Sequence, residues 1–491
     1  MAKGIGSSGG GAVRSAGATA VSTAVVSVVA ALAAVLLARR FGRDIETDGF
    51  LAAYGVYLVL GLAAQALRIV VMPELARAAT AGRLADEIWG YAAALVLLAV
   101  PAGALTIALA EPLGGAITGA LPDDAARTAT EALGWLVAAG GLQLLAALFA
   151  SGLAARDSYG VAAVAYAAGA VAGLGLFVAL ADDHGLVALA WGLLLNGAIS
   201  AGLPLAFLLR HLGGRPSAVR GLGSRVWSLA QGAALPLSLQ ALYVLALRLA
   251  ADLGVGQVTS LSYAYLIASV LVAASAAALG LVSSVPLTRR GLDPRAAAAH
   301  IVHASWLSVV LVVSGAGVFA LAGGRIAELV LGPAYSGEAG EELGRLLVFL
   351  APWMVVSVAI SLTLPLLFVV GQRRVLVPLA AALLPLQLAF GWLLREAFEL
   401  PGLAISLALT TLIAVVVLMA SLSLRLLGVV ALALGRLSLL HAALAALSFG
   451  VLSLLLSGVP AAVAGLALYA ALLAALRPRG LREAWAYVRA L

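Results

Sequence analysis

The sequence predicts an all-α membrane protein that crosses the bilayer fourteen times. Its 491 residues are 64% hydrophobic and only 10% charged, with a mean hydropathy of +1.12. Soluble proteins are about 45–50% apolar and about 25% charged. The apolar residues also occur in stretches of roughly 20, the length of helix that crosses a hydrocarbon core of about 30 Å. We therefore expect a polytopic helical fold.

The predicted spans follow one another with short connections. They cover residues 17–38, 50–72, 89–110, 132–154, 160–180, 186–209, 227–251, 259–285, 302–322, 346–370, 374–394, 401–422, 437–457 and 459–476. The first stretch is too long for a cleaved signal peptide, and many spans follow it. The longest predicted outer connections, residues 112–131 and 323–345, are too short to fold into a soluble domain.

Charge placement supports this count of spans independently. With the N-terminus inside, 20 of the 29 Lys and Arg residues fall in inner segments, 7 fall in outer loops and 2 fall within spans. Of the 22 acidic residues, 16 lie outside and 6 inside. Short cytoplasmic loops of membrane proteins carry an excess of Lys and Arg. We therefore expect both termini to be cytoplasmic, in a multi-pass protein of the cell membrane.

Two helices, an acidic turn and a terminal proline recur in the chain. Residues 14–77 contain two apolar helices, with Asp44, Glu46 and Asp48 in the turn between them and Pro73 at the end. A similar arrangement returns about 212 residues later and closes on Pro286. Internally repeated bundles are common in transporters, with the substrate site between the repeats. The alternative is that apolar helices resemble one another by chance.

This repeat and the basic segment after the sixth span predict the domain organisation. We expect two pseudo-symmetric six-helix lobes and an appended helix pair. The predicted segments are a disordered Gly/Ser-rich cytoplasmic tail at 1–13, an N-lobe at 14–209, a cytoplasmic linker at 210–226, a C-lobe at 227–422, appended spans 13 and 14 at 423–476, and a cytoplasmic C-terminal tail at 477–491.

Composition excludes several kinds of chemistry. The chain has no cysteine, which rules out disulfides, thiol catalysis and Cys-ligated metals. His300 and His303 lack a third nearby ligand and are interpreted as a helix end. No phosphate-binding loop and no mid-span carboxylate is present in the sequence. We expect no cofactor, no metal and no nucleic-acid partner, because the net charge of +7 lies in short loops that set orientation.

Two arginines fall inside predicted spans, Arg68 in span 2 and Arg248 in span 7. A charge within the membrane is costly and is a functional candidate by default. Both arginines lie within about two turns of a helix end, so snorkelling to the headgroups is the competing interpretation. If Arg68 points inward, its guanidinium suits a phosphate.

Spans 1, 2, 7 and 8 carry the polar faces, at equivalent places of the two halves. One interpretation is a central cavity that these faces line; the other is close helix packing through small hydroxyl residues. The predicted substrate-binding residues are Arg14, Ser22, Gln65, Arg68, Gln231, Gln240, Tyr243, Arg248 and Tyr263. We predict no catalytic residue.

The turn after span 1 and the start of span 8 resemble a known family. Residues 38–42 (Ala-Arg-Arg-Phe-Gly), residues 47–50 (Thr-Asp-Gly-Phe) and residues 258–264 (Val-Thr-Ser-Leu-Ser-Tyr-Ala) are similar to MviN/MurJ-type lipid II flippases of the multidrug/oligosaccharidyl-lipid/polysaccharide (MOP) exporter superfamily. The resemblance implies two six-helix lobes plus a terminal pair. It covers most of the chain, and its motifs are short.

The chain departs from that family where the flippases carry arginines. Span 1 has Ser27 and Ala33 at the comparable places, span 2 has residues 59–61 (Val-Leu-Gly), and span 8 has Tyr265-Leu266 in place of an Asp-Arg pair. These differences indicate a divergent member that moves another lipid-linked glycan.

The resemblance implies a flippase rather than an enzyme. It would carry a polyprenyl-diphosphate-linked precursor, lipid II-like or a polysaccharide repeat unit, to the outer leaflet by alternating access. The alternatives are a MOP-type multidrug antiporter and a polyprenyl-dependent glycosyltransferase that uses the acids of the outer loops. The expected partners are the lipid-linked glycan and membrane lipids. We expect a monomer, and proteins of cell-envelope synthesis are the candidate protein partners.

Overall fold

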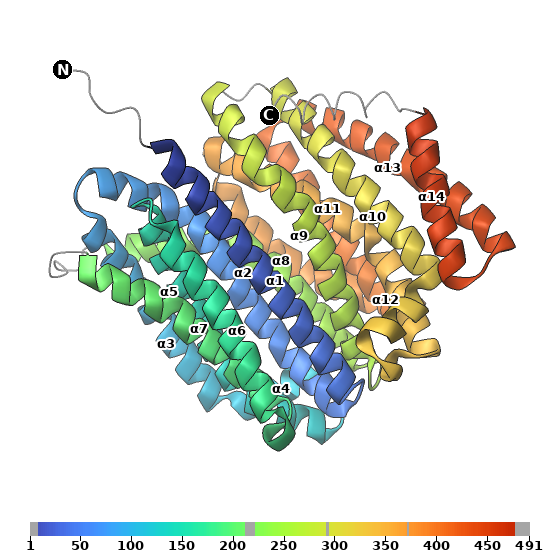
Figure 1. Ribbon diagram of the computed structural model, residues 1–491, viewed down its shortest axis with the longest axis horizontal. Coiled ribbons are helices and arrows are strands. Elements are labelled where there is room, and N and C mark those ends of the chain that lie inside the picture. The colour runs from blue at the N-terminus through green and yellow to red at the C-terminus, as the bar shows by residue number, and fades with distance from the viewer. Residues whose placement is uncertain (1–7, 212–220, 291–293, 371–372, 477–491) are drawn as a thin grey trace. The chain divides into compact units, whose positions relative to one another are not determined.

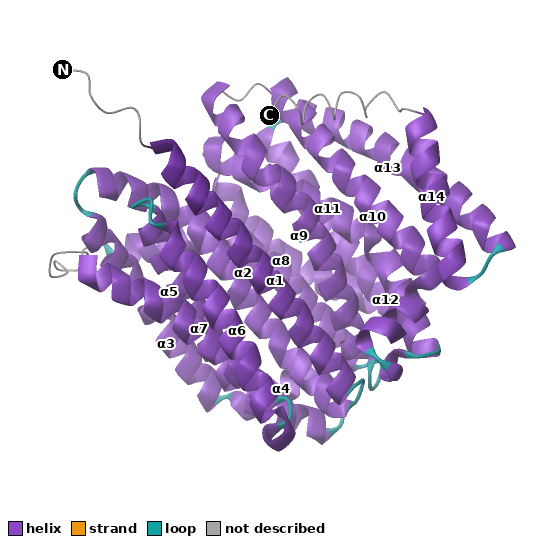
Figure 2. Cartoon of the chain, viewed as in Figure 1, coloured by secondary structure: helices purple, strands orange, loops and turns teal. Residues whose placement is uncertain are grey.

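The computed structural model describes residues 8–211, 221–290, 294–370 and 373–476. These residues form long helices joined by short loops, with no strand among them (Figure 2). Helices satisfy every internal backbone hydrogen bond within the segment, which a chain in hydrocarbon requires. The predicted all-α polytopic fold is confirmed, and the chain is a multi-pass membrane protein.

The chain divides into two compact units, Met1–Val244 and Leu245–Leu491. The first contains α1 (Ser8–Phe41), α2 (Ile45–Thr80), α3 (Leu84–Ala108), α4 (Ala110–Thr118), α5 (Asp123–Ala154), α6 (Tyr159–His184), α7 (Val187–His211) and most of α8 (Leu222–Ala251). Within this unit α2 packs mainly on α5, α5 on α7, α7 on α6, and α6 on α1 (Figure 1). These contacts bring α1 and α2 into one bundle with α6, although α6 begins 79 positions after α2 ends.

Close packing in the first unit depends on small residues. A Cβ added at Gly173 of α6 would lie 2.4 Å from the carbonyl oxygen of Gly192 of α7. The two backbones therefore touch directly, as membrane helices do where glycines face each other. The apolar core of this unit joins α2, α3 and α5 and includes Val71, Ile88 and Leu148, each of them fully buried.

The second unit begins with the end of α8. It continues through α9 (Gln257–Arg290), α10 (Pro294–Leu331), the short 3-10 helix η1 (Pro333–Tyr335), α11 (Glu338–Val370), the 3-10 turn η2 (Arg373–Val375), α12 (Leu376–Leu422), α13 (Leu424–Leu455) and α14 (Gly458–Leu476). α11 packs against α9, α10 and α12, and the α13–α14 pair packs on α10. That pair has its own apolar cluster, which includes Phe449 and Tyr469.

The fourteen predicted spans all correspond to helices. Twelve helices in the described part of the chain are long and apolar enough to cross a membrane. α12 accounts for two of the predicted spans, because its backbone breaks at Glu399, where φ is 55° and ψ is −133°. Pro401 follows this break and starts the next helical segment. α9 supplies the eighth span, and its first part, Gln257–Ala273, is apolar.

The helices extend beyond the apolar stretches that predicted them. α5 begins at Asp123 rather than near residue 132, and α11 begins at Glu338 rather than near residue 346. Acidic residues in a first turn favour the positive end of the helix dipole, so a polar turn continues the helix past the apolar run. α4 lies in a segment for which no helix was predicted, and α1 begins at Ser8, inside the predicted tail. The predicted domain limits stay predictions.

Candidate functional site

One face of α2 carries polar and aromatic residues instead of aliphatic ones. Tyr54, Tyr57, Gly61, Gln65 and Arg68 recur every three or four residues, which places them on the same side of a helix. We call these five residues the α2 strip. The two tyrosines are half-buried, whereas the side chains of Gln65 and Arg68 are exposed. The sequence predicted Gln65 and Arg68 as binding residues, and both lie on this strip.

Arg68 is held by an aromatic residue of another helix. Its Nη2 donates a hydrogen bond to the hydroxyl of Tyr166 on α6, at 3.2 Å, and its guanidinium carbon lies 5.2 Å from the centre of that ring. A cation over a phenol ring is attracted by the electron-rich face. The contact leaves Nε and Nη1 of Arg68 without a protein partner among the described residues. Arg68 is therefore oriented and still able to bind an anion.

Three aromatic rings stack along the first part of α2. Phe50 and Tyr54 have ring centroids 6.2 Å apart and planes 15° apart; for Tyr54 and Tyr57 the values are 5.5 Å and 25°. Phe50 is fully buried and anchors the stack. The Tyr57 side chain also hydrogen-bonds with that of Gln143 on α5. We call these three rings the aromatic ladder.

Four further predicted residues with described side chains lie in α1 and α8, and all are at least partly buried. Ser22 is buried and donates to the carbonyl oxygen of Ala163 on α6, at 2.6 Å. Arg14 lies in α1, but its side chain falls outside the described residues. Gln240 and Tyr243 of α8 are buried, and Gln231 is half-buried. Their predicted binding roles stay predictions.

A partly buried ion pair links the start of α8 to α3. Arg225 binds Glu87 at 3.0 Å and lies 5.7 Å above the ring of Tyr91. A Cβ at Gly90 would be 2.6 Å from the guanidinium carbon, so this glycine makes room for the arginine. The Tyr91 hydroxyl donates to Glu74 of α2. This cluster joins three helices of the first unit.

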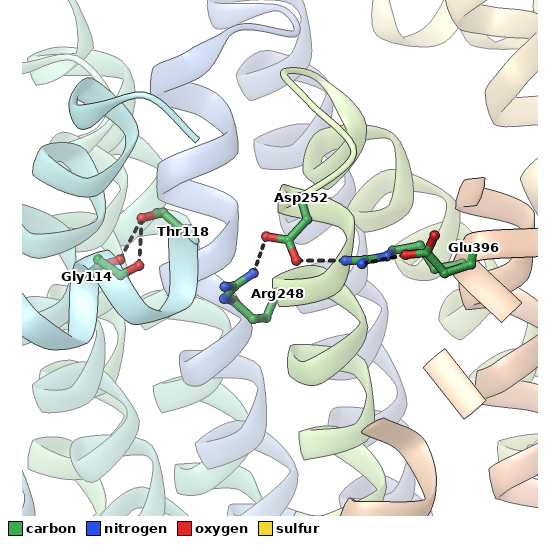
Figure 3. Close-up of polar contacts among 7 residues, drawn as sticks. Gly114, Thr118, Arg248, Asp252 and Glu396 are labelled. Atoms are coloured by element: carbon green, nitrogen blue, oxygen red, sulfur yellow. Dashed lines mark hydrogen bonds and ion pairs between the residues drawn. The ribbon is translucent and has the colours of Figure 1, made fainter. Parts of the chain in front are cut away.

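In the second unit, Arg248 enters an ion cluster at the end of α8. It binds Asp252 at 2.5 Å, and Asp252 also binds Arg395 of α12 at 2.7 Å (Figure 3). Arg395 in turn reaches Glu396 at 3.1 Å. Arg248 therefore has a carboxylate partner in the protein. Its position in the last turn of α8 also suits a cation at the negative end of a helix dipole.

The charges of this cluster act on the acidity of Asp252. Burial alone raises the pKa of the Asp252 carboxyl, but the hydrogen bonds and positive charges of Arg248 and Arg395 outweigh burial and lower it below its usual value. Asp252 is therefore ionised at neutral pH and compensates both arginines.

Two further polar contacts lie in the helices of the second unit. Tyr263 of α9 is buried edge-to-face against Tyr335, with ring centroids 5.6 Å apart. Gln387 donates to the hydroxyl of Ser406, at 2.8 Å, between the two halves of α12. Tyr263 was predicted as a binding residue, whereas Gln387 and Ser406 were not predicted.

Acidic residues that were predicted to lie in outer loops have structural contacts. Asp44 caps α2 by accepting a hydrogen bond from the backbone N–H of Thr47, at 2.8 Å. Asp182 pairs with Arg40, and Asp48 is fully buried. Helix caps of this type are common where a helix begins. A glycosyltransferase site built on these acids thus receives no support from their positions.

The sequence analysis did not predict four residues of this candidate site, Tyr54, Tyr57, Gln143 and Tyr166. The spacing of Tyr54 and Tyr57 relative to Arg68 could have revealed the first two, because it repeats the helical period. Tyr166 and Gln143 belong to other helices, and no local pattern connects them to α2. The site that these residues form offers one oriented guanidinium, one exposed amide and a stack of rings along one helix.

Comparisons with known proteins support the fold. No protein-family model and no curated protein matches the sequence. The solved structure of the lipid II flippase MurJ in an inward closed conformation is similar with a TM-score of 0.73 at 13% sequence identity, covering 94% of this chain and 98% of that chain.

Two MATE transporters are also similar. An inward-facing MATE family transporter of the MOP superfamily has a TM-score of 0.59 at 16% identity, covering 81% of this chain and 98% of its own. The Vibrio cholerae MATE transporter VcmN in its bent form has a TM-score of 0.54 at 16% identity, covering 86% and 98%. The predicted resemblance is confirmed at the level of the fold, which this chain shares with MurJ and with MATE transporters.

Proposed function

We propose that this protein is a flippase that moves a polyprenyl-diphosphate-linked glycan precursor of the cell envelope from the inner to the outer leaflet of the cytoplasmic membrane. The observation that carries the proposal is Arg68, which is exposed on α2 and oriented by Tyr166. The shared fold with MurJ supports a transporter that works by alternating access.

The chemistry of Arg68 fits a diphosphate. A guanidinium in a membrane helix must reach water, an anion or the interface, because its transfer to hydrocarbon is costly. Nε and Nη1 remain for the bidentate hydrogen bonds that planar guanidinium groups form with phosphate oxygens. Tyr166 holds the side chain in one orientation, which reduces the entropy lost when the anion binds.

Loop charges support the direction of movement. The basic inner loops attract an anionic headgroup, and each nearby Lys or Arg adds about 1 kcal/mol of attraction at an anionic surface. The acidic outer loops repel the same headgroup once it is released. If the basic loops lie on the cytoplasmic side, both termini of the chain are cytoplasmic as well.

The test is flipping in reconstituted proteoliposomes with labelled lipid-linked glycans. Arg68→Ala should reduce the rate about 10- to 100-fold, since a hydrogen bond to a charged group contributes about 1.5–3 kcal/mol. Arg68→Lys should retain part of the activity. Arg77→Ala is the matched control, because Arg77 is an exposed arginine of the same helix whose side chain hydrogen-bonds to the backbone carbonyl of Pro73. Normal transport by Arg68→Ala would contradict a role in substrate binding and would support the interpretation that Arg68 only reaches the lipid headgroups.

A multidrug antiporter is the second candidate function. The structural likeness to MATE transporters favours it, as does Glu74 of α2, which accepts a hydrogen bond from Tyr91 near the end of that helix. Such an antiporter needs a carboxylate in its helices. Proton-driven export of cationic dyes by the same proteoliposomes, lost in Glu74→Gln, would support this function over the flippase.

A further inference from the structure

The aromatic ladder ends at Tyr57, about two helical turns before Gln65 on the α2 strip. Its rings belong to residues 50, 54 and 57, and the next position on that face is Gly61, which has no side chain. A Cβ added at Gly61 would meet no atom within 4 Å. The helix therefore presents an open position directly after the last ring of the ladder.

Tyr57 is the neighbour of that position on the helix surface, because residues four apart lie on one face. One face of the Tyr57 ring stacks on Tyr54, and the Gln143 contact fixes the hydroxyl end. Because the stack advances along α2 from Phe50 through Tyr54 to Tyr57, the other face of Tyr57 is the one on the side of Gly61. A ring placed there would continue the ladder. Gln65 and Arg68 follow on the same face of the helix.

We infer that Tyr57 and Gly61 form a carbohydrate subsite, in which a pyranose ring of the transported lipid stacks on Tyr57 above Gly61 while Arg68 binds the diphosphate. The inference rests on the proposed function. The C–H groups of a sugar carry partial positive charge and are attracted by the electron-rich face of a phenol ring. Gln65 lies between Gly61 and Arg68, and its exposed amide has donors and acceptors for sugar hydroxyls.

The spacing limits which sugar is recognised. Gly61 and Arg68 are seven positions apart, which is about 10 Å along a helix. A sugar close to the diphosphate can occupy this position while the diphosphate is on Arg68, whereas the far end of a long glycan cannot. The subsite therefore selects for the presence of a sugar next to the diphosphate and tolerates variation further out.

The experiment compares the binding of three lipids to the full-length protein in nanodiscs. They are a polyprenyl diphosphate without sugar, the same lipid with one sugar and the same lipid with a disaccharide. The unmodified protein should bind the two glycosylated lipids at least about tenfold more tightly than the bare diphosphate. Arg68→Ala should weaken the binding of all three, because each carries the diphosphate.

Gly61→Leu should remove the preference for sugar and leave the affinity for the bare diphosphate unchanged, because leucine occupies the sugar position. Gly175→Leu on α6 is the matched control, since a Cβ at Gly175 also meets no atom within 4 Å. Tyr57→Ala should abolish the preference, whereas Tyr57→Phe, which keeps the ring, should retain most of it. Thermal unfolding of each variant shows that it is folded.

Equal binding of all three lipids by the unmodified protein would overturn the subsite and leave the proposed function standing. A Gly61→Leu variant that is folded and still prefers glycosylated lipids would do the same. Failure of the unmodified protein to bind any of the three lipids would overturn the proposed function itself, and the subsite with it.

Discussion

Arg395 and Asp252 lie 143 positions apart in the sequence and form an ion pair of 2.7 Å. Asp252 directly follows α8, and Arg395 belongs to the first half of α12, close to the break at Glu399. Only 14% of the Arg395 side chain and 28% of the Asp252 side chain are exposed. The pair therefore lies between the surface and the interior, where ion pairs have more effect than at a fully exposed site.

Asp252→Asn should destabilise the second unit. The change removes the charge that compensates both Arg248 and Arg395, and Arg395 would keep only its ion pair with the largely exposed Glu396. The expected loss is about 1–3 kcal/mol, between the values for exposed and fully buried pairs. Thermal unfolding in detergent measures it. Glu396→Gln is the control, because Glu396 is largely exposed and should change stability by less than about 0.5 kcal/mol.

The same aspartate predicts a pH dependence. Its pKa is lowered in the folded protein, so its stabilisation is fully present above the unfolded value of about 3.9 and is lost as pH falls through the lower folded value. The difference in melting temperature between the unmodified protein and Asp252→Asn should be constant from pH 5 to pH 7 and shrink below about pH 4. A difference that persists unchanged at pH 2–3 would contradict this assignment.

Glu399→Gly should stabilise the protein. Glu399 has φ 55° and ψ −133°, while the ends of α4 and α6 use glycines with nearly the same backbone angles, Gly119 at 61° and −119° and Gly185 at 58° and −139°. A side chain is strained in this region, and glycine is not. Because Glu399 is exposed, its removal should cost little, and we expect a gain of about 1 kcal/mol. Gly185→Glu is the reverse test and should destabilise the protein.

Exchanging the charges of Arg225 and Glu87 should distinguish an ion pair from simple packing. Arg225→Ala leaves Glu87 without its partner and should cost about 1–3 kcal/mol in thermal unfolding, since both side chains are largely buried. Arg225→Glu combined with Glu87→Arg should recover part of that loss. Arg225→Glu alone and Glu87→Arg alone are the single charge reversals. A double variant that is no more stable than either of them would contradict an ionic role for the pair.

Hydrophobic periodicity and charge placement predicted the number and order of the helices, because a membrane requires long apolar segments. They did not predict helix ends such as that of α5 at Asp123, since an acidic first turn extends a helix without raising its hydropathy. α4 is too short and too polar at its start to resemble a span.

The candidate site was predicted only in part. Gln65 and Arg68 were found because a polar residue in an apolar helix stands out in the sequence. Their contacts were not found, since Tyr166 is 98 positions from Arg68 and only the folded bundle brings the two together. Arg248 stood out for the same reason as Arg68, yet its carboxylate partner four residues on gives it a structural contact.

α8 has a mechanical consequence for any transport cycle. Near its start, Arg225 forms an ion pair with Glu87 of α3. Directly after its end, Asp252 forms an ion pair with Arg395 of α12. The division between the two units falls inside α8, after Val244. Thirty helical residues form a rod of about 45 Å that resists stretching. Pro236 lacks the N–H that would bond the carbonyl of Gly232, so the rod is weakest there. Any bending of α8 should therefore concentrate near Pro236.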